Sequence, residues 1–147
     1  MDDVRKFCQV MMESKEDIFF AIVSRETQTH IGNVRVGSID WDQKVTGFGI
    51  LIGDEEFRGK GIGTEVMELI KELCFVELGL NELRFPVVCE NQAAIRLYRR
   101  ADFREAGACS RNFEKSGRSL PQVEFVETAV EWKNRSRAGS VECRTPQ

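Results

Sequence analysis

The segment 57-FRGKGIGTEV-66 carries glycine at three alternate positions and leads directly into an apolar pattern of helical period. Because glycine has no Cβ, such a turn can adopt positive φ angles and leave its backbone N–H groups accessible. At the start of a helix, these N–H groups and the helix dipole favour an anion. The segment is therefore either a phosphate-binding turn or a tight bend between a strand and a helix.

The glycine spacing narrows the kind of phosphate site. Gly59-x-Gly61-x-Gly63 matches neither the G-x-x-x-x-G-K-[ST] nor the G-x-G-x-x-G pattern. A nucleoside-triphosphate loop and a dinucleotide site are therefore disfavoured, and Arg58 and Lys60 add positive charge for another anion. A regulatory module that binds a nucleotide or phosphate through this loop stays open as an alternative.

Three β-rich runs precede the glycine turn. They are 17-DIFFAIVSRE-26, 31-IGNVRVGSIDW-41 and 45-VTGFGILIG-53, and polar turn residues separate them. Short polar connections between successive strands are typical of an antiparallel meander. The first half of the chain is therefore predicted to be a three-stranded meander.

The second half predicts helices and further strands. A helix is expected from Gly61 to Leu78, followed by a strand over 82–89 and a second helix that Asn91 caps. A strand–helix–strand passage implies a parallel pair with a right-handed crossover, so the fold class is α/β with a mixed sheet. Ligands of such units bind where a strand's carboxyl end meets the next helix, which is the position of the glycine turn.

The two ends of the chain are less regular. Residues 1–13 show a helical apolar spacing, and 103-FREAGAC-109 and 123-VEFVETAVEW-132 predict two strands joined by a loop. Residues 133–147 are polar and aperiodic, so we expect a disordered tail after a single domain over residues 1–132.

Composition excludes several classes of protein. The net charge of −3 gives no basic field for nucleic acid or an anionic membrane, and no apolar run is long enough to span a bilayer. A cytoplasmic location is expected. The five cysteines contain no CxxC pair and there is one histidine, so neither a disulfide framework nor a metal site is expected.

Two motifs, taken together, indicate a family. Arg58-x-x-Gly61-x-Gly63 resembles the [RQ]-x-x-G-x-[GA] loop of the GNAT superfamily of N-acetyltransferases, and 91-NQAAIRLYRRADF-103 resembles its N-x-x-A-x-x-L-Y-x-x-x-G-F motif. They lie one helix and one strand apart, as in the family. The resemblance covers about residues 18–132 and is nearest to the branch of ribosomal-protein, spermidine and amino-sugar acetyltransferases.

The resemblance implies a GNAT fold that binds acetyl-CoA, without a metal. The pyrophosphate would lie at the glycine turn, and the pantetheine arm between splayed strands over 46–52 and 82–89. Asn91 serves either as a helix cap alone or also as a cofactor contact. The implied cofactor-binding residues are Leu51, Ile52, Gly53, Arg58, Gly59, Lys60, Gly61, Ile62, Gly63, Thr64, Asn91 and Ala94.

The implied reaction is acetyl transfer from the thioester to a primary amine of a small molecule or protein. The amine must lose a proton before it attacks, and the departing thiolate can take one. By the family motif Tyr98 donates that proton, whereas its helical position alone would suggest core packing.

The sequence departs from the family pattern in three places. Gly47 stands where many relatives have a glutamate base, which leaves a carboxylate or histidine acting through water as a substitute. Asp102 replaces the glycine of the closing G-F. By this resemblance the first strand and helix of relatives have no counterpart, so the edge strand 17-DIFFAIV-23 suggests either a homodimer or a chain truncated at this end. The candidate substitutes for the base are Asp40, Asp42, Glu90 and His30.

These departures leave two readings of the function. One is an active N-acetyltransferase. The alternative is a degenerate GNAT protein that binds acetyl-CoA or CoA without efficient turnover and serves as a sensor or interaction module.

Overall fold

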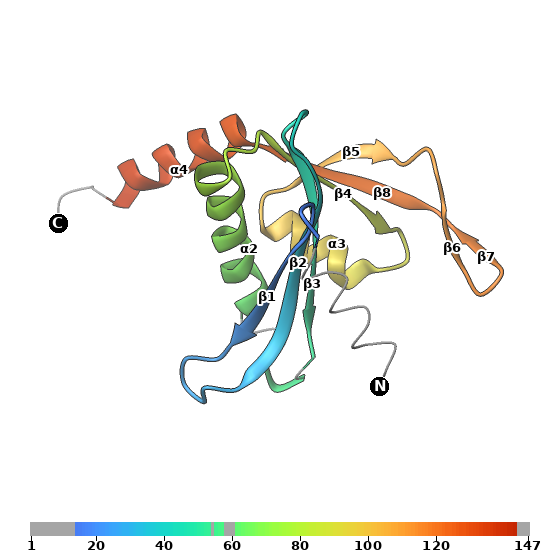
Figure 1. The fold of residues 1–147 in the computed structure, drawn as a ribbon, viewed down its shortest axis with the longest axis horizontal. Helices are drawn as coiled ribbons and strands as arrows, with labels where there is room; N and C mark the ends of the chain where they lie inside the picture. The colour runs from blue at the N-terminus through green and yellow to red at the C-terminus, as the bar shows by residue number, and fades with distance from the viewer. Residues whose placement is uncertain (1–13, 54, 58–60, 144–147) are drawn as a thin grey trace.

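The computed structural model describes residues 14–53, 55–57 and 61–143, with side chains described as far as Arg137. A six-stranded mixed sheet of order β1-β2-β3-β4-β8-β5 forms its centre, and a separate hairpin pairs β6 with β7 (Figure 1). The elements are β1 (Ile18–Val23), β2 (His30–Asp40), β3 (Val45–Ile52), a 3₁₀ turn (Glu55–Phe57), α2 (Ile62–Glu72), a π-helical segment (Leu73–Glu77), β4 (Glu82–Val88), α3 (Gln92–Arg100), β5 (Arg104–Ala108), β6 (Phe113–Lys115), β7 (Arg118–Leu120), β8 (Gln122–Thr128) and α4 (Ala129–Cys143).

The predicted meander is confirmed. β1 pairs antiparallel with β2, and β2 pairs antiparallel with β3. In β2, Val34 and Val36 are buried, whereas Asn33, whose side chain lies on the other face of the sheet, is exposed. This alternation places one face of the meander against the helices.

β3 and β4 are parallel and separate almost at once. Their pairing consists of Val45 with Glu82 and Thr46 with Leu83. β3 then continues to Ile52 and β4 to Val88 without further pairing between them. The predicted splayed pair is therefore present, as a V that opens toward the carboxyl ends of both strands.

Pro86 lies in β4, where its missing N–H removes no hydrogen bond from the sheet. The N–H of Glu82 donates to the Lys44 carbonyl on the β3 side, and successive residues of a strand point their N–H groups to opposite sides. The nitrogen of Pro86 therefore points toward β3, into the V, where no ladder bond is lost.

The crossover helix begins and ends as the sequence predicts. α2 and the following π-helical segment cover Ile62–Glu77, and Gly79 ends the helix with φ of 67°. Asn91 caps α3 by accepting a hydrogen bond from the Ala94 N–H at 3.2 Å. Each helix is the next α-helix after one strand of the V: α2 follows β3 after the 3₁₀ turn, and α3 follows β4.

An aromatic cluster fills the helix side of the V. Phe48 of β3 and Phe85 of β4 have ring centroids 4.7 Å apart, and Phe85 lies 4.7 Å from Tyr98 of α3. Phe103 and Phe125 complete the cluster at 5.0 Å and 6.2 Å from Phe85. All five side chains are buried, so they form the centre of the core.

The expectation of a strand through residue 132 is wrong at its end. β8 stops at Thr128, and α4 begins at Ala129. The Glu131 N–H donates to Thr128 Oγ1, and the Thr128 N–H donates to Glu131 Oε2, which is a reciprocal capping box. The T-x-x-E pattern in the sequence signals this helix start.

The remaining expectations concern the loop between the last two predicted strands, the tail over residues 133–147 and the helix over residues 1–13. The connection between β5 and β8 contains the β6–β7 hairpin, whose turn residues Ser116 and Gly117 have φ of 51° and 76°. The predicted disordered tail is helical as far as Cys143. The helix expected over residues 1–13 lies outside the described residues. Within the described ranges, no helix is long and apolar enough to cross a membrane.

A buried ion cluster joins the helices to the sheet. Lys71 of α2 is fully buried, and its Nζ lies 2.7 Å from Glu127 of β8, which is 1% exposed. Lys71 also donates to the Ala101 carbonyl at the end of α3 and lies 4.5 Å from the Phe103 ring centroid. Arg135 of α4 pairs with Glu127 from the other side. Four elements are thus joined through three charged side chains, those of Lys71, Glu127 and Arg135.

We expect Lys71→Met to lower the free energy of unfolding by about 3 kcal/mol, because it leaves the buried Glu127 carboxylate without its fully buried ion-pair partner. Urea unfolding followed by circular dichroism measures the change. Arg118→Ala is the control, because the Arg118–Glu90 pair is 68% and 58% exposed, and we expect it to cost less than ~1 kcal/mol. Equal losses in the two variants would contradict this account.

Candidate active site

The glycine turn ends at the first turn of α2. Gly61 is the N-cap with φ of 81°, and no side chain among the residues that the structure describes caps this helix end. A positive φ is the conformation that glycine adopts without strain. The Glu65 N–H donates to the Gly61 carbonyl at 3.1 Å, so the amides before it point out of the helix end. Arg58, Gly59 and Lys60 lie outside the described residues.

Gly63 has a packing role. A Cβ on Gly63 would lie 3.1 Å from Leu97 Cδ1, so glycine allows α2 to approach α3 closely. Ile62 is partly buried against the core, and Thr64 lies on the half-exposed side of the first turn. The turn therefore holds α2 near α3 as well as exposing its own backbone.

The backbone N–H and C=O groups of β3 point alternately toward β2 and toward the V. The Gly53 N–H donates to the Ile31 carbonyl of β2 at 2.9 Å, and Leu51 shares this direction by alternation. The residues of β3 that point their backbone groups into the V are therefore Phe48, Ile50 and Ile52. Of the three positions expected to pair with pantetheine, Ile52 has the required direction, and the Gly53 N–H is already bonded within the sheet.

Asn91 and Ala94 lie at the other arm of the V. The Asn91 side chain is used as the cap of α3, with its Oδ1 accepting from the Ala94 N–H. The amide nitrogen of Asn91 is not used in this cap. Asn91 can therefore cap the helix and still donate a hydrogen bond toward a ligand in the V.

Tyr98 lies in the aromatic cluster, 7% exposed. Its ring is 6.0 Å from Phe48 and 4.7 Å from Phe85, the residues that line the two arms of the V. Burial raises the pKa of the Tyr98 phenol above its ordinary value. Tyr98 therefore packs in the core beside the V, with a phenol whose pKa is raised by burial.

No carboxylate replaces the missing base at Gly47 in the described part of the chain. A Cβ there would lie 3.2 Å from the Arg84 carbonyl, so the position itself is crowded. Asp40 accepts hydrogen bonds from the turn amides of Asp42 and Gln43. Glu90 pairs with Arg118 at 3.1 Å. Both carboxylates thus make contacts within the fold.

The His30 side chain makes hydrogen bonds at the start of β2. Its Nε2 lies 2.7 Å from the Gly32 carbonyl and 2.8 Å from Asn33 Oδ1, at the start of β2. Because β2 lies between β1 and β3, the ring is separated from the V by a whole strand.

The sequence reasoning missed a charged group on the sheet face opposite the helices. Arg84 of β4 pairs with Glu82 at 2.5 Å and with Glu124 of β8 at 2.7 Å. On the same face, no atom of the described residues lies within 4 Å of a Cβ position at Gly49 of β3. This face therefore offers access to the V beside two carboxylates and one guanidinium. The alternation of Glu82, Arg84 and Pro86 with apolar residues is the signal in the sequence.

Asp102 accounts for the departure at the closing G-F. Its φ is 67°, so it holds the left-handed conformation of the glycine that it replaces. Its side chain lies 3.3 Å from Arg135 Nε of α4. An aspartate tolerates this backbone better than most residues, and here it also gains an ion pair.

Comparisons with known proteins agree with this geometry. The family model described as Acetyltransferase (GNAT) domain matches residues 1–104. The chain therefore belongs to the GNAT acetyltransferase domain family, which uses acetyl-CoA.

Three individual proteins that resemble this chain are each less than 30% identical to it. The chain is 28% identical over 109 residues to the probable N-acetyltransferase YjcK of Bacillus subtilis, with 74% of this chain and 60% of that protein covered. It thus spans about 60% of the length of this relative. A chimera of the Vibrio cholerae spermidine N-acetyltransferase SpeG with hSSAT has a TM-score of 0.81 at 22% identity, covering 90% of this chain and 82% of that one. The dodecameric Vibrio cholerae spermidine N-acetyltransferase has a TM-score of 0.79 at 23% identity, covering 92% and 78%.

Gly61 and Gly53 provide a matched test of the turn. Gly61→Ala should lower the free energy of unfolding by about 1 kcal/mol or more, because alanine is strained at φ of 81°. Gly53→Ala should be neutral, since the nearest atom to its Cβ position is 4.0 Å away. Urea unfolding without ligand measures both, and a Gly61→Ala variant as stable as Gly53→Ala would contradict the assignment.

Proposed function

We propose that the chain is an acetyl-CoA-dependent N-acetyltransferase. The observation that carries the proposal is the V between β3 and β4, because it lies beside Tyr98 and between the two family motifs. An extended pantetheine arm can occupy such an opening as an additional strand would.

The cofactor would bind along the V with its pyrophosphate at the start of α2. Gly61, Ile62, Gly63 and Thr64 would supply backbone amides there, and the neighbouring 58–60 segment would add the basic side chains of Arg58 and Lys60. Ile52 would pair with an amide of the pantetheine arm. Asn91 and Ala94 would contact it from the β4 side.

The chemistry needs two proton movements. The acceptor ammonium loses a proton to become nucleophilic, and the nitrogen then attacks the thioester carbon. The C–S bond breaks, and the CoA sulfur takes a proton. Tyr98 is the proton donor in this proposal, because its burial keeps the phenol protonated and its ring faces both arms of the V. No carboxylate is positioned at Gly47, so the acceptor's proton would leave through water.

The acceptor would reach the thioester from the open face at Gly49. The helix side is closed by the aromatic cluster, whereas the opposite face has no side chain at Gly47 or Gly49. Glu82 and Glu124 with Arg84 leave one net negative charge there. A cationic amine, such as the polyamine named for the Vibrio cholerae proteins, suits this charge. A peptide amine is the other acceptor to test.

Binding of acetyl-CoA is the first test. We expect acetyl-CoA to raise the unfolding temperature, because a ligand that binds only the folded state stabilises it. ATP and NAD serve as controls and should give smaller shifts, and Gly61→Ala should reduce the shift. No shift with saturating acetyl-CoA would overturn the proposed function. Binding without thiol release over polyamines, amino sugars and peptide amines would support the alternative of a GNAT module without turnover.

Tyr98→Phe tests the proton donor. Because phenylalanine keeps the ring in the aromatic cluster, we expect little change in unfolding and in the Kd for acetyl-CoA. The rate of acetyl transfer should fall by about 10²-fold, the scale of general acid catalysis. A rate equal to that of the wild type would leave Tyr98 with a packing role alone.

The proposed Tyr98 proton donor also predicts a pH dependence for the wild type. The raised pKa of Tyr98 keeps its proton in place through neutral and mildly alkaline pH. In the wild type, kcat/KM should therefore rise with pH as the acceptor amine loses its proton, with no alkaline decline below the ordinary tyrosine pKa.

A further inference from the structure

Glu124 of β8 lies on the outer face of the sheet, which is the face opposite the helices. Phe125, the next residue, pairs with Phe85 of β4 and has its ring 5.6 Å from that of Tyr98, on the helix side. Successive side chains of a strand point to opposite faces, so Glu124 points to the outer face. There its Oε2 accepts a hydrogen bond of 2.7 Å from Arg84 of β4.

Glu124 is level with the part of the V where β3 and β4 have separated. Continuing the register of these two strands puts Gly49 level with Pro86, three residues after the last pair. Pro86 lies opposite Glu124 in β8, and Gly107 of β5 lies opposite Glu124 on the other side. Neither glycine nor proline has a side chain that can exchange a proton. Glu124 is therefore the one ionisable residue in this row across β3, β4, β8 and β5.

The charged and titratable groups that surround Glu124 come from two strands. β4 contributes Arg84, which also binds Glu82. β5 contributes Arg104, which is already paired with α4, and the chain after it contributes Cys109. Burial, followed by the charge of Glu124, raises the pKa of the Cys109 thiol, so it stays neutral. Arg84 is thus the cation in direct contact with Glu124, and Glu124 Oε1 accepts no hydrogen bond from the described residues.

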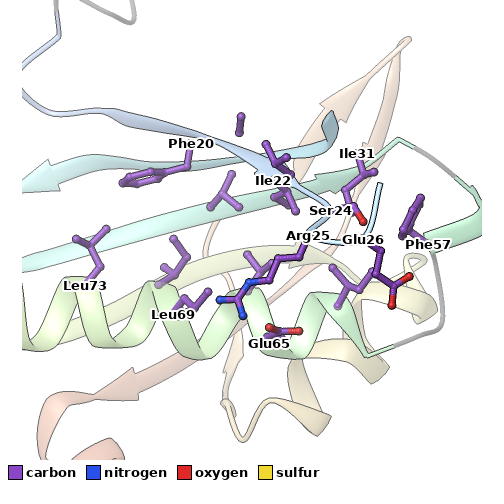
Figure 2. A pocket seen from close by; sticks show the side chains of 16 residues that line it. Phe20, Ile22, Ser24, Arg25, Glu26, Ile31, Phe57, Glu65, Leu69 and Leu73 are labelled. Carbon is purple, nitrogen blue, oxygen red and sulfur yellow. The ribbon is translucent and has the colours of Figure 1, made fainter. Parts of the chain in front are cut away.

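Other carboxylates near the first three strands are less suited to act on a ligand in the V. Asp17 lies on the outer face beside β2, but its Oδ2 accepts from Ser14 and its Oδ1 from Arg35, so both oxygens are used. Glu26 and Glu65 line a cavity between β1 and α2 (Figure 2). That cavity is on the helix side of the sheet, so these two carboxylates are separated from the outer face by the sheet itself.

Glu82 binds the same guanidinium as Glu124, but at another level of the V. Glu82 pairs with Val45, where β3 and β4 are still joined, whereas Glu124 is level with Gly49, where they have parted. The two carboxylates lie 2.5 Å and 2.7 Å from the nitrogens of Arg84. A thioester can enter the V only where the strands have parted, so the acceptor nitrogen beside it is at the level of Glu124.

We propose that Glu124 takes the proton of the acceptor ammonium through a water molecule. This inference rests on the proposed acetyl transfer and supplies the base that Gly47 lacks. An N–H bond of the ammonium breaks, the proton passes over the water to the Glu124 carboxylate, and the freed nitrogen attacks the thioester carbon. Glu124 is 30% exposed and returns the proton to solvent. Arg84 is a positioning residue, because it holds the carboxylate from β4.

The pH dependence of Glu124→Gln tests this base. Without the carboxylate only the free amine reacts, so kcat/KM for spermidine should fall by about 10²-fold at pH ~7. The loss should shrink as the pH approaches ~10, the pKa of an alkyl amine. For a peptide α-amine, whose pKa is ~8, the loss at pH ~7 should stay below ~10-fold. Glu124→Asp should restore part of the rate, because it keeps a carboxylate on the same strand.

Glu82→Gln is the matched control, because it removes the same charge and the other bond of Arg84. Its loss in kcat/KM should be below ~10-fold, the scale of one exposed charge pair, and equal at every pH, since the route of the proton is unchanged. Arg84 keeps one partner in either variant, so we expect both to fold and to keep the wild-type Kd for acetyl-CoA. Urea unfolding and ligand titration verify this.

The outcomes separate this inference from the proposed function. A loss in Glu124→Gln that is the same at every pH, or profiles that coincide for Glu124→Gln and Glu82→Gln, would overturn the role of Glu124 and leave the acetyltransferase standing. A wild type that acetylates neither spermidine nor the peptide amine at any pH would overturn both.

Discussion

The parting of β3 and β4 after two residue pairs is the constraint on which the rest of the fold depends. Separated parallel strands leave unpaired backbone and a wedge that water or side chains must fill. Here Phe48 and Phe85 approach edge to face beneath the opening, with Tyr98 beside them. Rigid aromatic packing thus holds the arms apart on one side and leaves the other side for ligands.

The buried ion cluster fixes the helices relative to that opening. Lys71 of α2 reaches Glu127 of β8 and the Ala101 carbonyl at the end of α3. Since Tyr98 lies one turn before Ala101, the same contact fixes the helix that carries it. The start of α2, the arm of the V at β4 and Tyr98 are therefore held in one arrangement. Arg135 extends this arrangement to α4.

Local signals predicted most of the elements, and the errors come from local signals that were missed and from contacts that no local signal gives. The start of α2 at Gly61, the Asn91 cap and the three-stranded meander follow from spacing and turn residues, and the structure confirms them. The capping box at Thr128 and the Ser116–Gly117 turn were also local signals, and they were missed in segments treated as strand and loop. The direction of the Gly53 N–H depends on the pairing of β3 with β2, which no local pattern in the sequence predicts.

The sequence by itself determined the family, the order of the elements and the residues around the glycine turn, because helix caps, turns and periodicity act over a few residues. Only the tertiary structure decided which residues meet. It inserted β8 between β4 and β5, placed Lys71 against Glu127, and left Gly49 open beside the acidic residues. These outcomes depend on strand order and on which face each side chain takes, and both are set by packing between segments far apart in the chain.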